Sequence, residues 1–244
     1  MSFTDRFSGL ATAYAAARPS YPVESVDVLI AGLGDPATLA VVDLGAGTGI
    51  SSRLIAARGP RVFAIEPNAK MREAAAPDER VVWVDGTAEA TTLPAASVDV
   101  VAAFQAWHWV DHPAGVAEAE RILKPGGRMA AIYNERDERD PFTAAYGAVV
   151  MKYATDATEE RRFNAVRTFE SIAPGRTQRF EYGNVHPLDR AGVHQRAESS
   201  SYLPHSGPAA DAMHVELDAL CDTFLQPDGM VEMHLVTIVV RVDR

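Results

Sequence analysis

The chain has 244 residues, of which 47% are hydrophobic, enough to bury one sizeable core. Its formal net charge of −10 argues against a nucleic-acid partner and against an anionic membrane surface, since both attract basic proteins. Cys221 is the single cysteine, so an intramolecular disulfide and a cysteine-based metal cluster are both excluded.

The N-terminal part is predicted to form two helices, over residues 3–17 and 23–31, separated by a break at the two prolines of residues 18–22. Residues 1–6 begin no apolar run, so we expect no secretory signal. No apolar run reaches the length that spans a membrane. We therefore expect a cytoplasmic protein with no membrane partner, as a monomer or a homodimer.

Residues 41–49 indicate a buried strand that runs into a glycine turn and opens a helix. Glycines alternate with small residues, so the backbone can approach a ligand closely, and the first amides of the helix face the same space. Asp43 stands two places before the first glycine, and its carboxylate is expected to point toward the cofactor mouth. There it would repel a pyrophosphate but suit a cationic amino group. A dinucleotide turn needs its third glycine one residue later. The candidate ligand residues here are Asp43, Gly45, Ala46, Gly47, Thr48 and Gly49.

Further short strands follow at regular intervals. A strand over 61–65 ends at Glu66, whose carboxylate can accept both hydroxyls of a ribose. Residues 67–71 are predicted as the start of the next helix, with Pro67 at its first position. A strand over 81–84 precedes the loop 85–89.

The pattern D-x-G-x-G-x-G at 43–49 resembles motif I of the class I S-adenosylmethionine-dependent methyltransferases, and the later motifs follow in the family's order up to Tyr133. Residues 93–101 resemble the family's approach to strand four, and residues 123–129 resemble its turn into strand five. The resemblance implies an α/β fold: a Rossmann-like, doubly wound, seven-stranded sheet, mostly parallel with an antiparallel last strand. It implies S-adenosylmethionine as cofactor and S-adenosylhomocysteine as product, with the loop after strand three beside the adenine. It extends the cofactor site to Glu66, Pro67, Met71, Gly86, Thr87, Ala88, Glu89, Phe104 and Gln105.

The segment after strand four, residues 104–111, is expected to face the transferred methyl group. Trp107 and Trp109 would form a flat apolar wall, or pack on the next helix. His108 is a candidate general base, or a structural hydrogen-bonding group. A carboxylate acceptor is already ionised and needs no base, whereas a hydroxyl or carbon acceptor needs one.

Three segments, 18–22, 106–111 and 196–204, resemble the trans-aconitate methyltransferase-like branch, the methyltransferase type 11 group. This resemblance implies a small-molecule acceptor and an N-terminal helix folded over the cofactor. The candidate substrate residues are Tyr14, Arg18, Tyr21, Trp107, His108 and Trp109, and no metal is expected. Arginines that could hold a carboxylate acceptor are Arg18, Arg136, Arg139, Arg161, Arg162 and Arg196, at least four of which we expect to be solvated.

After residue 134 a charged run, 135–140, predicts a solvated connection. Helices over 142–153 and 159–172 are expected to cap the cofactor mouth, followed by a strand over 177–185, helices over 189–200 and 208–224, and a strand over 231–242. The prediction is one domain over 1–244, divided into an N-terminal lid (1–34), a cofactor-binding core (39–134), a helical cap (135–175) and a C-terminal part (176–244).

The function predicted is methyl transfer from S-adenosylmethionine to a small molecule, with a carboxylate or hydroxyl oxygen as the acceptor atoms considered. Two alternatives remain open at this point. One is an NAD-dependent oxidoreductase on the same kind of sheet, and the other is a methyltransferase-like binding module without turnover.

Overall fold

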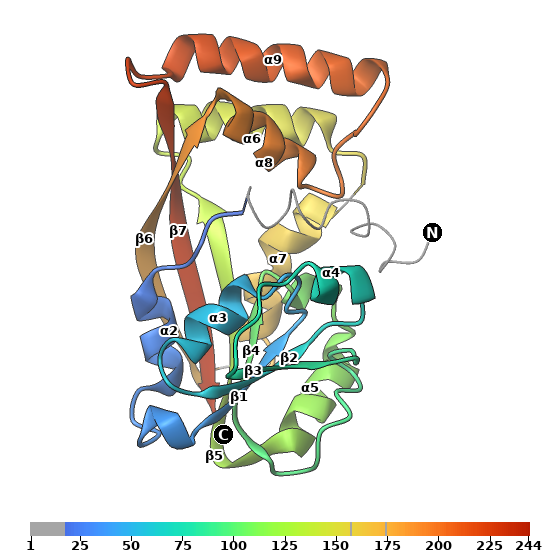
Figure 1. Cartoon of the computed structure of the whole chain (residues 1–244), viewed down its shortest axis with the longest axis vertical. Helices are drawn as coiled ribbons and strands as arrows, with labels where there is room; N and C mark the ends of the chain where they lie inside the picture. Colours follow the sequence, from blue (N-terminus) through green and yellow to red (C-terminus); the bar gives the residue numbers. More distant parts are fainter. Residues whose placement is uncertain (1–17, 157, 174) are drawn as a thin grey trace.

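The computed structural model describes residues 18–156, 158–173 and 175–244. The helix expected over 3–17, the first half of the expected lid (1–34) and the candidate substrate residue Tyr14 lie outside the described residues. The described residues form a seven-stranded sheet in the order β3-β2-β1-β4-β5-β7-β6 (Figure 1).

The sheet is parallel except for one strand. β1 (Ala40–Leu44), β2 (Arg61–Ile65), β3 (Val81–Val84), β4 (Val98–Phe104) and β5 (Leu123–Arg136) pair in parallel. β7 (Met230–Asp243) lies antiparallel between β5 and β6 (Thr177–Asp189). This confirms the predicted doubly wound sheet, mostly parallel with an antiparallel last strand.

Helices cover both faces of the sheet, which explains why its strands are apolar on both sides. On one face, α2 (Val23–Ile30) and α3 (Ile50–Ala56) bury Leu29 and Ile55 in a cluster with Val41. On the other face, α5 (His112–Ile122) and α7 (Thr158–Glu170) bury Ile122 and Phe169 with other residues of the sheet. The shorter elements are η2 (Pro36–Thr38), α4 (Ala69–Glu73) and η3 (Trp107–Trp109).

The three long strands β5, β6 and β7 extend beyond the rest of the sheet and carry a separate group of helices at their far end (Figure 1). These helices are α6 (Pro141–Tyr153), α8 (Arg190–Glu198) and α9 (Pro208–Phe224). They bury a second apolar cluster against β7, which includes Tyr146, Met213 and Leu235. We call this group, with the strand ends beneath it, the upper lobe.

The expected cap is corrected by this arrangement. α6 belongs to the upper lobe, whereas α7 packs on the sheet, because its apolar residues Ala165, Val166 and Phe169 are buried in the sheet's own core. The two helices therefore do not form one cap.

The charged run is also different from the expected solvated connection. Glu135 and Arg136 are the last residues of β5, because they pair in register with Val236 and Leu235 of β7. Asp140 is the N-cap of α6, where its carboxylate accepts a hydrogen bond from the backbone N–H of Thr143 at 2.8 Å.

Candidate functional site

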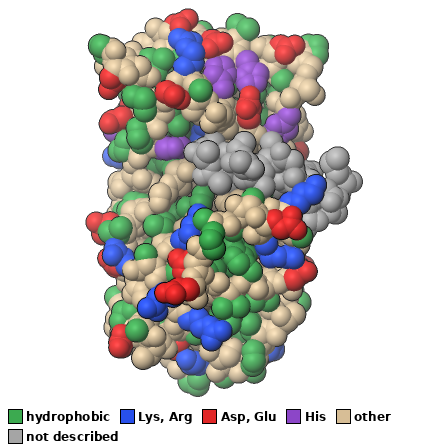
Figure 2. All heavy atoms as spheres, viewed as in Figure 1, with side chains coloured by type: hydrophobic (Ala, Val, Ile, Leu, Met, Phe, Trp, Pro, Cys, Tyr) green, Lys and Arg blue, Asp and Glu red, His purple; other side chains and the backbone are tan. Residues whose placement is uncertain are grey.

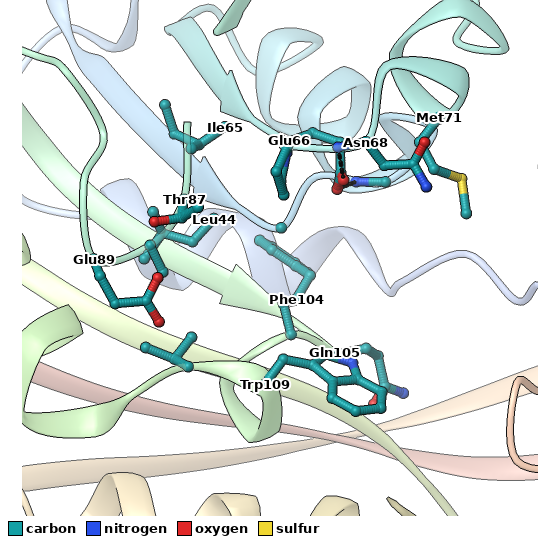
Figure 3. Close-up of a pocket in the computed structure, with 16 residues that line it drawn as sticks. Leu44, Ile65, Glu66, Asn68, Met71, Thr87, Glu89, Phe104, Gln105 and Trp109 are labelled. Carbon is teal, nitrogen blue, oxygen red and sulfur yellow. Dashed lines mark hydrogen bonds between the residues drawn. The ribbon is translucent and has the colours of Figure 1, made fainter. Parts of the chain in front are cut away.

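A cavity of about 230 Å³ opens at the carboxyl ends of β1, β2 and β4, the edge where open α/β sheets bind ligands. Figure 3 shows Glu66, Asn68 and Met71 on one side of it and Gln105 and Trp109 on another. The predicted cofactor residues that line it are Gly45, Gly47, Glu66, Pro67, Met71, Thr87, Ala88, Glu89, Phe104 and Gln105.

The glycine turn between β1 and α3 forms the floor of this cavity. Gly45, Gly47 and Gly49 all have positive φ, of 66°, 58° and 76°, which favours glycine at each position. A Cβ atom on Gly45 would lie 2.7 Å from the Cβ of Ala106, on the chain leaving β4. The turn therefore needs glycine for two reasons, its backbone conformation and the close approach of the neighbouring chain.

Glu66 connects this turn to the end of β2. Its Oε2 accepts a hydrogen bond from the backbone N–H of Gly47, and its Oε1 accepts one from the N–H of Asn68, both at 2.9 Å. The residue is only 8% exposed, and burial raises the pKa of its carboxyl, while these two hydrogen bonds act in the opposite direction. A carboxylate has about four lone-pair positions, so it retains acceptor capacity toward the cavity.

Asp43 does not line the cavity, in contrast to the expectation that its carboxylate points toward the mouth. It is fully buried, and its Oδ2 accepts hydrogen bonds from the hydroxyls of Ser51 and Ser52, each at 2.6 Å. Its Oδ1 is buried and has no hydrogen-bond partner among the residues that the structure describes. Burial, with a smaller contribution from Glu66, raises the pKa of Asp43 to about 6. Asp43 therefore holds the start of α3 beneath the glycine turn.

The loop after β3 contributes part of its predicted residues. Thr87, Ala88 and Glu89 line the cavity, whereas Gly86 does not. The carboxylate of Glu89 accepts a hydrogen bond from the backbone N–H of Asp111 at 2.8 Å, which ties this loop to the start of α5. Gly49 also lies away from the cavity, beside the ring of Trp83.

The segment after β4 places its two tryptophans in different environments. Trp109 lines the cavity, and the guanidinium of Arg161 lies 5.5 Å from its ring centre. Trp107 is 1% exposed and lies in the core, with its ring 5.1 Å from that of Phe169. The expectation that Trp107 lines the acceptor pocket is therefore wrong, because the packing of α7 on the sheet encloses it.

His108 does not line the described cavity. Its ring Nδ1 lies 3.1 Å from the hydroxyl of Tyr133, which also accepts a hydrogen bond from the His108 backbone N–H at 3.0 Å. Tyr133 comes from β5, so this pair fixes η3 on the sheet.

A second, smaller cavity of about 40 Å³ adjoins the first. The two share the lining residues Gly45, Gly47, Phe104 and Gln105, so they lie side by side. Its other lining residues include the predicted Ala46, Thr48, Arg18 and Tyr21, together with Asn134 and Arg196.

The exposure of the six candidate arginines differs from the expectation that at least four are solvated. Arg139 and Arg161 are exposed, and Arg139 pairs with Asp137. Arg18, Arg136 and Arg196 are half-buried, and the side chain of Arg162 lies outside the described residues. Fewer of them are solvated than the four expected, because the upper lobe covers three.

Sequence reasoning missed several lining residues, namely Leu44, Ile65, Asn68, Ala106 and Val110. Asn68 carried a signal that could have been found, because asparagine is a favoured N-cap. Its side-chain oxygen accepts a hydrogen bond from the Lys70 N–H at 3.0 Å, so α4 begins after Asn68 and not at Pro67.

Within the described ranges, no group of three or more His, Cys, Asp or Glu side chains is arranged to hold a metal ion. In the same part of the chain, no helix combines the length and the apolar character needed to span a bilayer.

The chain is similar in sequence to proteins of one known family. Residues 42–131 match the methyltransferase domain family. An uncharacterized methyltransferase of Mycobacterium tuberculosis is 40% identical over 147 residues, which are 59% of this chain and 58% of that protein. The chain thus aligns with less than two thirds of that relative. An uncharacterized methyltransferase of Geobacillus thermodenitrificans is 30% identical over 182 residues, which are 70% of this chain and 85% of the relative.

A solved structure shares the whole fold. A protein from Anaeromyxobacter dehalogenans, described as a type II methyltransferase, superposes with a TM-score of 0.66 at 22% identity, over 93% of this chain and 97% of the other. The trans-aconitate-like branch is not named by these comparisons and stays a prediction. From the sequence relatives and the shared fold, the chain belongs to the class I S-adenosylmethionine-dependent methyltransferases.

Proposed function

We propose that this protein binds S-adenosylmethionine in the cavity at the carboxyl ends of β1, β2 and β4 and transfers its methyl group to a small-molecule acceptor. The observation that carries the proposal is Glu66, a carboxylate at the end of β2 that faces the cavity and is hydrogen-bonded to the glycine turn. A carboxylate in this position suits the two hydroxyls of a ribose. When bound, the cofactor supplies a methyl group on a positively charged sulfur, which is already activated for transfer.

The other lining residues fit the remaining parts of such a ligand. The loop residues Thr87 and Ala88, with Leu44 and Ile65, offer a largely apolar wall for an adenine ring. The glycine turn brings backbone close to the ligand without side chains. Trp109 and Phe104 line the cavity with aromatic rings, which suits a site whose main task is to align the acceptor and exclude solvent.

The charge distribution supports a small acceptor over a nucleic acid. Figure 2 shows acidic and basic side chains interspersed over the visible face, without a basic stripe among the described residues there. This agrees with the net charge of −10.

The position of His108 indicates which kind of acceptor atom the protein methylates. Because its ring lies against Tyr133 and does not line the cavity, we infer that it orients η3 and Trp109 and does not accept a proton from the acceptor. A carboxylate oxygen is the acceptor that fits this inference, since it needs no base at neutral pH. His108→Gln should then change the rate little, whereas loss of a general base typically costs about 10²–10⁴-fold.

Two measurements test the proposal. Calorimetric titration with S-adenosylhomocysteine and, separately, with NADH should show binding of the first only. Transfer of label from methyl-labelled S-adenosylmethionine to a small-molecule extract should then yield a labelled product. Binding of NADH alone would support an oxidoreductase, and cofactor binding without any label transfer would support a non-catalytic module.

A further inference from the structure

Arg196 on α8 is unusual among the charged side chains of the upper lobe. It lines the small second cavity, and its Nε is buried without a hydrogen-bond partner in the described part of the chain. Its side chain forms no ion pair with any residue that the structure describes. A partly buried guanidinium without a counter-charge costs folding free energy, so its retention points to a ligand that supplies the missing negative charge.

The positive charges of Arg18 and Arg136 near Arg196 increase this cost. The strongest influences on its pKa after burial are Arg18, the phenols of Tyr146 and Tyr202, and Arg136. Burial and the like charge of Arg18 lower the pKa of Arg196 to about 10. His186 on β6 is also close enough to be affected, since burial and the charge of Arg196 lower its pKa to about 4. The surroundings of Arg196 are thus rich in positive charge and in hydroxyl donors.

The nearby carboxylates are directed elsewhere. Glu135 precedes Arg136 in β5, and since successive side chains of a strand point to opposite faces, it lies on the face opposite to Asn134 and Arg136. Asn134 marks the face of the second cavity, because it lines that cavity and bonds to Thr237 and Asn184 of the neighbouring strands. Glu198, two residues after Arg196 on α8, lies 3.5 Å from the ring of His214 on α9.

The volume of the second cavity limits the size of the group that can reach Arg196. The second cavity is only about 40 Å³, which leaves room for a few heavy atoms and not for a whole acceptor. It lies directly beside the larger cavity, because both are lined by Gly45, Gly47, Phe104 and Gln105. A molecule that occupies the larger cavity can therefore extend one small group to Arg196.

We propose that Arg196, together with Arg18, forms a binding site for the carboxylate group of a molecule held in the adjoining cavity. An arginine fork matches a carboxylate with two parallel hydrogen bonds, and the small volume of the site excludes a bulkier group. This site rests on the proposed function, which supplies the molecule. Two molecules can contribute the carboxylate, namely the acceptor and the methionine end of the cofactor. Arg196 lies outside the family-matched segment 42–131, which favours the acceptor.

The experiment compares the wild-type protein with Arg196→Met and with Arg139→Met as the matched control, since Arg139 is exposed and pairs with Asp137. Each protein is titrated with S-adenosylhomocysteine and with 5′-methylthioadenosine, which lacks the methionine carboxylate. Each protein loaded with S-adenosylhomocysteine is then titrated with malonate and citrate as carboxylate probes. Circular dichroism and thermal unfolding confirm that the variants are folded, and Arg196→Lys tests whether charge alone restores binding.

The expected result is that Arg196→Met binds both nucleosides as the wild type does but loses at least 10-fold in affinity for the acid probes. A carboxylate from the cofactor would instead lower the affinity for S-adenosylhomocysteine at least 10-fold and leave that for 5′-methylthioadenosine unchanged. Both outcomes support the site and identify its ligand. Equal binding of all four compounds by the wild type and Arg196→Met would overturn it. If the wild type binds neither nucleoside, the proposed function fails, while malonate binding to the unliganded protein still tests the arginine site.

Discussion

The backbone N–H of Gly47 donates a hydrogen bond to Oε2 of Glu66 at 2.9 Å, so the glycine turn after β1 and the acidic end of β2 form one unit. The two residues are 19 positions apart in the chain. Adjacent parallel strands bring them together, because the carboxyl ends of β1 and β2 meet at the same edge of the sheet.

Replacing Glu66 with glutamine should weaken binding of S-adenosylhomocysteine. The amide keeps the shape of the side chain but has one acceptor oxygen in place of two, so either the turn or the ligand loses a charged hydrogen bond, worth about 1.5–3 kcal/mol. The expected change is roughly 10- to 100-fold in Kd by calorimetry. Glu73→Gln, an exposed carboxylate on α4, is the matched control. Equal affinity of folded Glu66→Gln and wild type would remove Glu66 from the binding site.

Replacing Gly45 with alanine should destabilise the protein and impair cofactor binding. The substitution strains a backbone with φ of 66° and places a Cβ 2.7 Å from the Cβ of Ala106. Gly126→Ala is the control, since Gly126 has φ of 80° but no atom within 4 Å of the added Cβ. Both variants carry the conformational cost, about 1–2 kcal/mol, and only Gly45→Ala carries the clash. Thermal unfolding should therefore show a larger loss for Gly45→Ala, and adding Ala106→Gly should recover part of it.

The two tryptophans after β4 should separate stability from binding. Trp107→Ala removes a fully buried ring and should cost about 3–5 kcal/mol in the free energy of unfolding, measured by denaturant titration. Trp109→Ala removes a half-buried ring that lines the cavity, so it should cost less stability and more ligand affinity. A larger stability loss in Trp109→Ala than in Trp107→Ala would contradict the assignment of Trp107 to the core.

Asp43 should make the unliganded protein less stable as the pH rises. Its pKa is about 6 in the folded protein, above the ordinary value of 3.8, so between these values the folded state binds more protons than the unfolded state. Stability contributed by this group is therefore present below about pH 4 and is lost as the pH rises toward 6. Asp43→Asn removes the ionisation. The difference in unfolding free energy between the variant and the wild type should shift in favour of the variant by on the order of 2–3 kcal/mol across this range.

Denaturant titrations of both proteins at several pH values from 4 to 7.5 measure that shift. Asp211→Asn, at an exposed position in the first turn of α9, serves as the control and should give a difference that does not vary in the same way. A constant difference between Asp43→Asn and wild type would show that Asp43 is ionised in the folded protein over the whole range.

The sequence by itself determined the sheet and the cofactor edge. The strands over 61–65 and 81–84 have the predicted bounds, because short apolar runs between polar turns leave little choice of register. The glycines of the turn and Glu66 were identified by local pattern, since backbone conformation and strand ends are properties of neighbouring residues.

Only the tertiary structure decided which side chains face the cavity. Trp107 and Trp109 are two residues apart in one segment, and the packing of α7 on the sheet makes one a core residue and leaves the other in the cavity. Asp43 lies beneath the turn because α3 presents two serine hydroxyls to it. Arg18 and Arg196 are brought to one small cavity from opposite ends of the chain, which no local pattern can indicate, because their proximity depends on how the upper lobe packs on β5 and β7.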